Sequence, residues 1–376
     1  MALSDWRIGI IGGGIGGIAA ALALARHGAG QVEVFEAAPA LAEVGAGLQI
    51  SPNGVRVLEA LGLGPAAAAV ASAPAAVELI DHARGRPVAR VPLGETARRR
   101  YGHPYWQFHR ADLLSVLAEA AREAGIPLRT GASAEVTGTA EAPAIALDGR
   151  EGAEPFDAVI AADGVRSPTR AAWFAGTPAR FTGHVAWRGL VPARHLAAPP
   201  AETTTVRMAQ GRHLVTYPLR GGSLVNFVAV EERASWTAEG WTHPDDPAAL
   251  ARAFAGGGPA TDALLGAVQE TFLWGLFDHP PVPRWNRGRI ALLGDACHPM
   301  MPFMAQGAGM AVEDAVVLAR CLHEGMADLP AALRRYERAR LARTAEIQVA
   351  SRGNADWVYG YDAWNVPLDT PPAAAA

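Results

Sequence analysis

A glycine-rich loop near the start of the chain restricts the possible folds more than any other feature. Gly12, Gly14 and Gly17 give the spacing G-x-G-x-x-G. The loop lies between residues 7–11, whose apolar side chains predict a buried strand, and residues 15–27, which predict a helix. Glycines at these positions let the backbone turn tightly and approach a pyrophosphate, whose charge the helix N-terminus stabilises. The loop therefore predicts a dinucleotide-binding unit; the alternative is a turn whose glycines only serve helix packing.

The segment around this loop also has to be weighed as a membrane segment. Residues 8–25 carry no charge and follow Arg7, as in a signal peptide or a transmembrane helix. Six glycines in the first ten of these residues would weaken a membrane helix. The strand-like run 31–36 follows at once and ends in Glu36, which is placed to accept hydrogen bonds from a ribose hydroxyl group. The sequence therefore predicts a βαβ unit and no membrane segment.

The composition excludes several classes of protein. The 376 residues are 50% hydrophobic and 19% charged, which is enough apolar material for more than one core of ordinary size. A net charge of -4 favours neither a nucleic-acid nor an anionic-membrane partner. All 33 basic residues are arginine, so the chain has no lysine for a Schiff base or a P-loop. Cys297 and Cys321 are too few for a disulfide framework, and we expect a cytoplasmic protein.

A change in the residue pattern along the chain predicts a β-rich insertion between helical parts. Ser51 and Pro52 are typical of a helix start, with Ser51 as the N-cap. Short runs between residues 173 and 284 are rich in β-forming residues and are separated by Gly or Pro turns, which predicts an inserted antiparallel sheet. The runs are 181–192, 203–208, 212–218 and 224–230.

The last predicted helix, over residues 331–350, carries five closely spaced arginines. Such a charge run is typical of a solvated helix face, and we expect no function for it. The arginines are Arg334, Arg335, Arg338, Arg340 and Arg343. The expected domains are a discontinuous dinucleotide-binding domain of residues 1–70, 101–172 and 285–330, a substrate-binding β-sheet domain of residues 71–100 and 173–284, a C-terminal helical segment of residues 331–366, and a disordered tail of residues 367–376.

Two later motifs indicate which dinucleotide is bound. Asp163 and Gly164 follow the predicted strand 157–162, and Gly294 and Asp295 follow the predicted strand 289–293. With the glycine loop and the segment 302–310, they resemble the three fingerprints of the single-component flavoprotein aromatic hydroxylases, a family that includes salicylate and 3-hydroxybenzoate hydroxylases. Residues 45–53 and 109–113 also match the family's pattern, so the resemblance runs in order from residue 7 to about residue 320.

The resemblance implies a fold, a cofactor and its contacts. The fold class is α/β: a Rossmann-like FAD-binding domain of the glutathione-reductase type, with an inserted antiparallel β-sheet substrate domain and a C-terminal helical segment. FAD is bound, and NADH or NADPH is the co-substrate. Both acidic motifs follow strands, so Asp163 and Asp295 are expected at strand ends, where open α/β sheets bind ligands. The expected cofactor-binding residues are Gly12, Gly14, Gly17, Glu36, Gly47, Arg110, Asp163, Asp295, Gly307, Ala308 and Gly309.

Two of these residues have plainer alternatives. Arg110 could form a surface salt bridge instead of contacting FAD, and Asp163 could serve only the turn that it forms with Gly164.

Asp295 suits the ribityl chain of FAD. The helix expected to start at Gly307 presents a positive end that would stabilise an anionic reduced flavin.

The resemblance also implies a monooxygenase reaction. NAD(P)H reduces the flavin, O2 adds to give a flavin C4a-hydroperoxide, and the electrophilic oxygen attacks an activated aromatic ring. This chemistry needs no metal, and the sequence has neither H-E-x-x-H nor paired C-x-x-C motifs, so we predict no metal site. The protein has to hold FAD beside the substrate and help to remove the proton of a ring hydroxyl group.

Residues 211–218 supply the catalytic candidates and resemble the active-site strand of the salicylate and 3-hydroxybenzoate hydroxylases. On a strand, His213 and Tyr217 share one face and lie roughly 13 Å apart, too far for a hydrogen bond. We expect His213 to deprotonate a phenol, because the ordinary pKa of histidine is near neutrality. Tyr217 is expected to line the pocket. The alternative for both is a packed side chain on a half-buried strand. Gln306, by resemblance, lies near the reacting ring.

Several alternatives stay open at this stage. Arg188 or Arg207 could bind a substrate carboxylate, and either could be a surface arginine. A flavin-dependent oxidase or reductase of the same fold, or a non-catalytic flavin-binding module, would also carry these motifs. A halogenase or a disulfide reductase is disfavoured, because W-x-W-x-I-P and C-x-x-x-x-C are missing. Substrates like salicylate, 3-hydroxybenzoate, 6-hydroxynicotinate or a larger polycyclic phenol are all possible. The protein could be a monomer or a homodimer.

Overall fold

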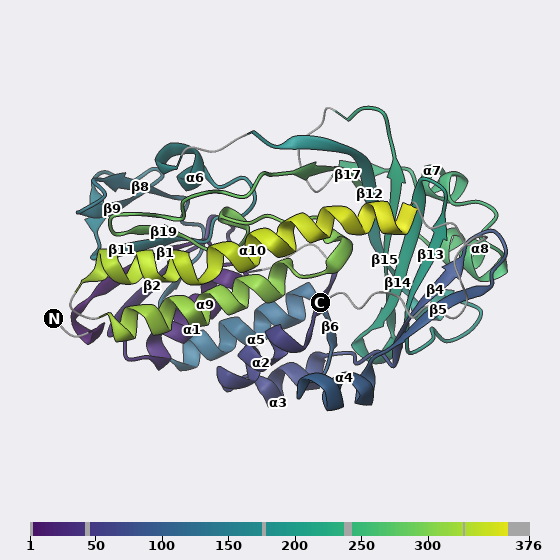
Figure 1. The fold of residues 1–376 in the computed structure, drawn as a ribbon, viewed down its shortest axis with the longest axis horizontal. Helices are drawn as coiled ribbons and strands as arrows, with labels where there is room; N and C mark the ends of the chain where they lie inside the picture. Colours follow the sequence, from purple (N-terminus) through teal and green to yellow (C-terminus); the bar gives the residue numbers. More distant parts are fainter. Residues whose placement is uncertain (1–2, 42–45, 175–177, 237–242, 326–327, 360–376) are drawn as a thin grey trace.

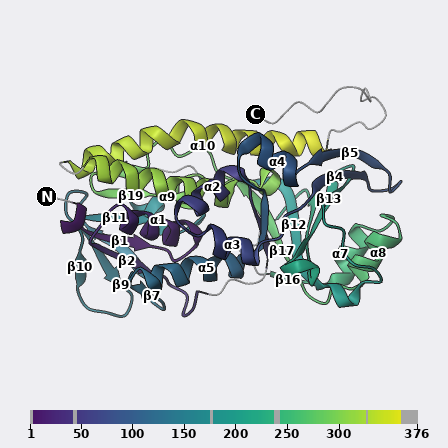
Figure 2. The same cartoon turned by 90° about the horizontal axis from the view of Figure 1, so that it is seen from below.

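The computed structural model describes residues 3–41, 46–174, 178–236, 243–325 and 328–359, the last seven of these by their backbone alone. The molecule is elongated, with a helix-rich end that holds the N-terminus and a β-rich end opposite (Figure 1). Helix α10 (Leu329–Tyr359) runs along both ends (Figure 2). The predicted tail, 367–376, and the end of the predicted helical segment, 360–366, lie outside the described residues.

A six-stranded sheet forms the centre of the helix-rich end, in the order β18-β19-β11-β1-β2-β7. Neighbouring strands are parallel, except that β18 is antiparallel to β19. The strands are β1 (Arg7–Ile11), β2 (Gln31–Phe35), β7 (Leu128–Arg129), β11 (Ala158–Ala161), β18 (Asn286–Arg287) and β19 (Ile290–Leu292). The strands predicted over 7–11, 31–36, 157–162 and 289–293 are confirmed to within one residue at each end.

The two faces of this sheet are covered differently, as the alternation along β1 requires. Ile8 and Ile10 belong to the core formed with three helices, α1 (Ile15–Arg26), α5 (Arg110–Glu123) and α9 (Gly307–Glu324). Gly9 points the other way, where a Cβ atom would lie 2.5 Å from the Ile145 side chain. That face is covered by a three-stranded antiparallel sheet of β8 (Ala134–Gly138), β9 (Pro143–Leu147) and β10 (Ala153–Pro155).

An eight-stranded sheet forms the β-rich end, in the order β16-β17-β12-β15-β14-β13-β4-β5. The predicted antiparallel sheet is confirmed at six of its seven strand pairs, and only β13 with β4 is parallel. The strands are β4 (Ala76–Asp81), β5 (Pro87–Pro92), β12 (Arg180–Pro192), β13 (Thr204–Ala209), β14 (Arg212–Leu219), β15 (Leu224–Glu232), β16 (His243–Asp245) and β17 (Thr271–Asp278). They come from the stretches expected to form the substrate domain, and we keep that division into domains as a proposal.

The two faces of the large sheet have different neighbours. On the outer face, Leu214 packs in a core with Leu250 of α7 (Pro247–Ala253) and Leu264 of α8 (Pro259–Gly266). Side chains alternate along β14, so His213 and Tyr217 lie on the opposite, inner face. That face is turned toward the helix-rich end (Figure 1).

A short strand pair and three helices join the two ends of the molecule. Strand β3 (Gly47–Ile50) pairs with β6 (Trp106–His109). Next to them lie α2 (Pro52–Ala60), α3 (Gly64–Val70) and α4 (Gly94–Tyr101). The helix predicted to start at Pro52 is confirmed with Ser51 as its N-cap residue, but the Ser51 hydroxyl caps no backbone N–H of the helix and instead bonds with the side chain of Asn53.

The C-terminal helix corrects one prediction. Arg340 is not part of a solvated face: only 3% of its surface is exposed, because α10 packs on α9 and turns this side chain inward. Arginines elsewhere on α10, such as Arg335, do reach solvent. Among the described residues, no helix is both long and apolar enough to span a membrane.

Candidate functional site

The glycine loop has the geometry that a close backbone approach requires. Gly12 has a φ of +106°, and a Cβ atom there would lie 2.2 Å from the carbonyl oxygen of Ala162. A Cβ atom at Gly17 would lie 1.9 Å from the carbonyl oxygen of Gly12. Gly14, by contrast, faces open space and is the N-cap residue of α1. The loop is therefore held tightly against β11 on one side and leaves the helix N-terminus accessible on the other.

Glu36 lies directly beside this loop. Its carboxylate accepts hydrogen bonds from the backbone N–H of Gly13, at 2.7 Å, and of Ala38, at 2.8 Å. The loop and the end of β2 are thus fixed to each other by one side chain. A carboxylate has about four acceptor positions, so two remain for a ribose hydroxyl group.

The two acidic motifs lie at the same edge of the sheet, because β11 and β19 are parallel neighbours. Asp163 follows β11, and one of its oxygens accepts a hydrogen bond from the N–H of Thr169 at 3.1 Å. Its other oxygen, Oδ1, is buried with no hydrogen-bond partner within the described part of the chain. Asp295 follows β19 and lies near Arg110. Burial of the guanidinium lowers the pKa of Arg110, and the carboxylate of Asp295 opposes this effect only in part.

The segment 302–310, which together with Gly294 and Asp295 forms the third flavin motif, leads into helix α9 at Gly307, with Gln306 as the N-cap. The amide of Gln306 donates to the Ser51 hydroxyl at 3.0 Å, and Ser51 lies 2.5 Å from Asn53 Oδ1. Gly309 lies against the side chains of Asn53 and Gln306. The start of α9 is therefore connected to the start of α2, which lies some 250 residues earlier in the chain.

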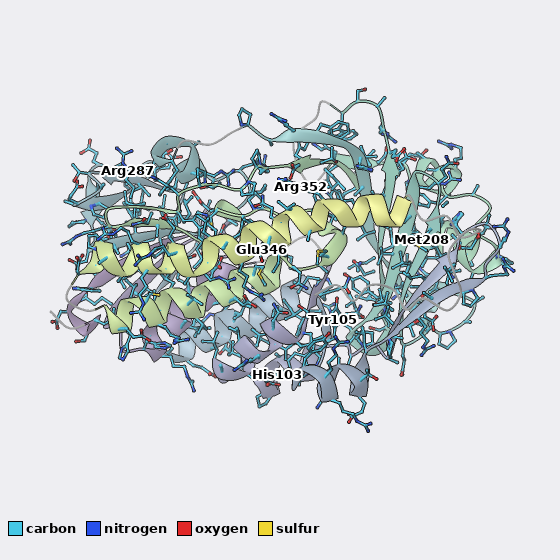
Figure 3. All side chains as sticks on the ribbon, viewed as in Figure 1. His103, Tyr105, Met208, Arg287, Glu346 and Arg352 are labelled. Carbon is cyan, nitrogen blue, oxygen red and sulfur yellow. The ribbon has the colours of Figure 1, made fainter. Side chains whose placement is uncertain are left out.

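Tyr217 reaches from the large sheet to β3. A Cβ atom at Gly47 would lie 2.5 Å from the Tyr217 hydroxyl, so only glycine fits there. The N–H of Gly47 donates to Asn226 Oδ1 at 2.7 Å. Tyr105, which lies between the helices and the large sheet (Figure 3), donates its hydroxyl to Gln49 at 2.7 Å. Burial raises the pKa of both tyrosines, and Tyr105 adds to the effect on Tyr217, so both hydroxyls keep their protons.

His213 is 5% exposed and lies four residues from Tyr217 on the same face. Its ring centroid is 5.7 Å from that of Phe303, which lies in the third motif, three residues before Gln306. His184 of β12 approaches the same phenylalanine, at 6.2 Å. Burial lowers the pKa of His213 to about 4, and repulsion from His184 contributes, so the imidazole is neutral near pH 7.

The two candidate arginines lie on opposite faces of the large sheet. Arg188 is on the inner face, 4.9 Å from the ring centroid of Trp274, which belongs to the apolar cluster around Phe303. Burial lowers the pKa of Arg188, and Arg110 acts in the same direction. Arg207 pairs with Leu214 of the outer face and is near Glu78. Only Arg188 is on the same side as His213 and Tyr217.

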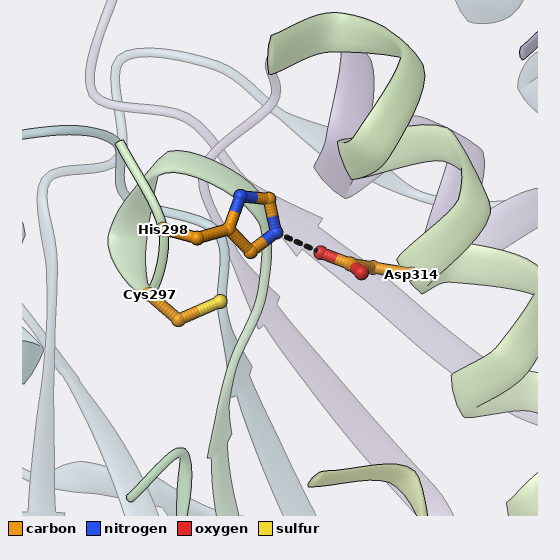
Figure 4. Close-up of side chains that lie close together, drawn as sticks. All are labelled: Cys297, His298 and Asp314. Atoms are coloured by element: carbon orange, nitrogen blue, oxygen red, sulfur yellow. Dashed lines mark hydrogen bonds and ion pairs between the residues drawn. The ribbon is translucent and has the colours of Figure 1, made fainter. Parts of the chain in front are cut away.

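Cys297, His298 and Asp314 form a buried cluster next to Asp295 (Figure 4). The atoms of these side chains that could bind a metal lie within 4.8 Å of one another. His298 Nε2 is 2.5 Å from Asp314, which also accepts a hydrogen bond from Arg340 at 2.6 Å. Burial, and then the carboxylate of Asp314, raise the pKa of the Cys297 thiol well above its ordinary value. A protonated thiol and a carboxylate paired with a guanidinium favour a hydrogen-bonded network over a metal centre.

Comparison with known proteins decides the family. The family model described as an FAD binding domain matches residues 5–351 of the chain. The chain belongs to this FAD-binding family. The flavoprotein is 39% identical to 3-amino-4-hydroxybenzoate 2-monooxygenase of Streptomyces platensis over 349 residues, which are 92% of this chain and 87% of that protein. It is 38% identical to 3-hydroxybenzoate 6-hydroxylase of Polaromonas naphthalenivorans over 352 residues, 93% of this chain and 87% of that protein.

A solved structure of an FAD complex has the same fold as this chain. Klebsiella pneumoniae HpxO, crystallised with FAD and uric acid, matches the flavoprotein with a TM-score of 0.82 and 30% identity over 95% of this chain and 90% of that one. The predicted family, fold class and FAD cofactor are thereby confirmed.

The residues of the site fit FAD. The accessible helix N-terminus at Gly14 suits a pyrophosphate, and the carboxylate of Glu36 suits a ribose. The buried Oδ1 atom of Asp163 lacks a partner within the described residues and is available as an acceptor. The roles of these residues, and those of Arg110, Asp295 and Gly307, stay proposals.

Sequence reasoning missed several residues of the site. Tyr105 and Asn226 had no motif to mark them, since their contacts join segments far apart in the chain. His184 precedes the Trp187–Arg188 segment, and no pattern indicated that it would approach Phe303. Asp314 and Arg340 lie on two helices, and only the packing of those helices brings them together.

Proposed function

We propose that the flavoprotein is an FAD-dependent monooxygenase that hydroxylates a small aromatic acid bearing a ring hydroxyl group, using NADH or NADPH and O2. The two curated relatives described above are named for hydroxybenzoate substrates. The observation that supports the proposal most is the contact of buried His213 with Phe303, because it joins the inner face of the large sheet to an FAD-binding motif. A substrate between these parts would meet a neutral imidazole and two protonated tyrosines.

Each of these side chains has a role in the proposed reaction. When bound, FAD supplies the exchange of electrons with the nicotinamide and O2. The neutral His213 accepts the proton of the ring hydroxyl group, which makes the ring electron-rich. Tyr217 keeps its proton and orients the substrate by donating a hydrogen bond, while Tyr105, whose hydroxyl donates to Gln49, lines the same space. Gln306, held by Ser51, lies at the start of α9, which would face the flavin.

Purified protein tests the proposal directly. FAD-loaded enzyme is expected to oxidise NADH or NADPH slowly alone and much faster when a hydroxybenzoate or a hydroxynicotinate is added. Mass spectrometry should then detect a product heavier by one oxygen atom, labelled from 18O2. Oxidation that no aromatic acid stimulates, with either nicotinamide, would contradict the proposal and favour an oxidase, a reductase or a non-catalytic flavoprotein.

The pH dependence of hydroxylation should reflect the lowered pKa of His213. A histidine with an ordinary pKa near 6.5 would be mostly protonated at pH 5.5 and unable to accept a proton. Because burial and His184 lower this pKa to about 4, the base form persists well below neutrality. The acid limb of kcat/KM assigned to His213 is therefore expected near pH 4. A limb near pH 6.5 that disappears in a His213 variant would contradict this.

Arg188 is expected to select acids over neutral analogues. Arg188→Gln should raise the KM for a hydroxybenzoate about tenfold or more, since a hydrogen bond to a charged group contributes roughly 1.5–3 kcal/mol. The KM for the matching hydroxybenzamide should change little. Arg207→Gln, on the outer face, is the matched control and should leave both values unchanged. Equal losses for acid and amide in the Arg188 variant would remove Arg188 as the carboxylate partner.

A further inference from the structure

One arginine of the C-terminal helix holds two adjacent carboxylates of α9. Arg340 Nε donates to Asp314 at 2.6 Å, and its Nη1 donates to Glu313 at 2.7 Å. Asp314 is 0% exposed and Arg340 is 3% exposed. Neighbouring carboxylates repel each other, and the planar fork of a guanidinium can satisfy both at once. Arg340 therefore fixes the direction in which each carboxylate points.

The first carboxylate, Asp314, reaches the acidic turn of the flavin site. Its Oδ2 atom accepts a hydrogen bond from the N–H of Gly294 at 3.2 Å and lies 2.5 Å from His298 Nε2. Gly294 immediately precedes Asp295, and the ring of His298 packs against Trp285 at 5.3 Å. Asp314 thus holds both ends of the short turn that bears Asp295, and Figure 4 shows its bond with His298.

The second carboxylate, Glu313, reaches the catalytic candidate Gln306. Its Oε1 atom accepts a hydrogen bond from Asn53 Nδ2 at 2.8 Å. Asn53 bonds with Ser51, and Ser51 accepts from the amide of Gln306 at 3.0 Å. Arg343 also donates to Glu313, at 3.0 and 3.1 Å, from a half-exposed position. Glu313 thus connects α10 to Gln306 through two intermediate side chains.

A buried ion pair is weak evidence for stability, because the loss of hydration offsets much of the attraction between the charges. What such a pair does supply is fixed geometry. Here both carboxylates lead from the same guanidinium to residues of the flavin site, whereas Glu324, the exposed partner of Arg335, pairs in turn with Arg320 of its own helix α9. The contacts therefore connect α10, through two side chains of α9, to two separate parts of the site.

We propose that Arg340 is a positioning residue of the flavin site, acting through Asp314 on the turn that bears Asp295 and through Glu313 on Gln306. The two branches serve different purposes. The Asp314 branch fixes a cofactor-binding segment and should govern FAD affinity. The Glu313 branch fixes a side chain beside the reacting ring and should govern how efficiently nicotinamide oxidation is coupled to hydroxylation. The second readout rests on the proposed function, whereas the first depends only on FAD binding.

Two charge-removing, shape-conserving variants test the branches separately. Asp314→Asn is expected to weaken FAD binding about tenfold, the loss of one charge-assisted contact. Glu313→Gln is expected to leave the Kd of FAD within about threefold, to shift the visible absorption spectrum of the bound flavin, and to lower the product formed per nicotinamide oxidised by about half or more. FAD fluorescence titration, absorption spectra and product analysis measure these effects. Asn53→Ala should reproduce the Glu313→Gln effects, and the double variant should be no worse than either alone.

Variants of Arg340 and a control complete the experiment. Arg340→Lys keeps the charge but loses the fork, and is expected to show both defects in milder form with folding retained. Arg335→Met, on the same helix, should show neither defect. Matched falls in melting temperature, FAD affinity and coupling across the Asp314, Glu313 and Arg340 variants would show a merely structural network and overturn the proposal, as would unchanged FAD affinity in Asp314→Asn. If the wild-type protein hydroxylates no aromatic acid, the proposed function fails while FAD affinity and the flavin spectrum still decide the two branches.

Discussion

His213→Ala is expected to slow hydroxylation by about 10²- to 10⁴-fold, the usual contribution of a positioned general base, while FAD stays bound. The imidazole is neutral because burial and repulsion from His184 lower its pKa to about 4. It contacts Phe303 of the third flavin motif, so its removal affects the substrate side of the flavin and leaves the glycine loop intact. Nicotinamide oxidation should continue, with its electrons released as hydrogen peroxide.

The measurement compares oxygen consumed, peroxide formed and hydroxylated product in the two proteins. His82→Ala is the matched control, because His82 is also buried and also has a pKa lowered by burial, but packs against Phe254 on the outer face. That variant should hydroxylate as the wild type does. Full coupling and unchanged turnover in His213→Ala would exclude His213 from the mechanism.

Gly12→Ala should produce a protein that binds FAD roughly 100-fold more weakly or not at all. Gly12 has a φ of +106°, which costs a residue with a side chain about 1–3 kcal/mol. The added Cβ atom would also lie 2.2 Å from the carbonyl oxygen of Ala162, so the loop and the end of β11 have to separate. Because Asp163 follows Ala162, one substitution displaces two of the three flavin motifs.

The ratio of absorbance at 450 and 280 nm, with the melting temperature of the apoprotein, checks this prediction. Gly14→Ala is the control for the backbone: its φ is -73°, and the new Cβ atom meets no protein atom within 4 Å. Its apoprotein should melt as the wild type does, so any loss of FAD there reflects contact with the cofactor. A Gly12→Ala protein with full FAD content would disprove the role of this loop.

Much of the site was predictable because its signals are local in the sequence. The spacing from Gly12 to Gly17 between two apolar runs, and the acidic residues after β11 and β19, each follow from a few consecutive residues. Parallel strands bring their carboxyl ends to one edge, so Asp163 and Asp295 were expected to lie together. Alternation along β14 likewise put His213 and Tyr217 on one face.

Other features depend on contacts between distant segments, which no local pattern encodes. The arginine-rich helix gave no sign of which arginine would turn toward α9, so the burial of Arg340 was missed. Ser51 is the N-cap residue of α2, as its type predicts, but its hydroxyl bonds with the side chains of Asn53 and Gln306 instead of a backbone N–H of the helix. Arg188 and Arg207 look alike in the sequence, and only the sheet register separates their faces.

The sequence by itself determined the βαβ unit, the FAD-binding family and the strand that carries His213, because glycine spacing and side-chain alternation act within a few residues of one another. The tertiary structure alone decided which side chains meet across the site. Tyr217 meets Gly47, His213 meets Phe303, and Arg340 meets Asp314 only after the large sheet and α10 have packed against the flavin-binding end. The physical reason is that burial and pairing are properties of packed surfaces, and those surfaces come from parts of the chain that lie far apart in sequence.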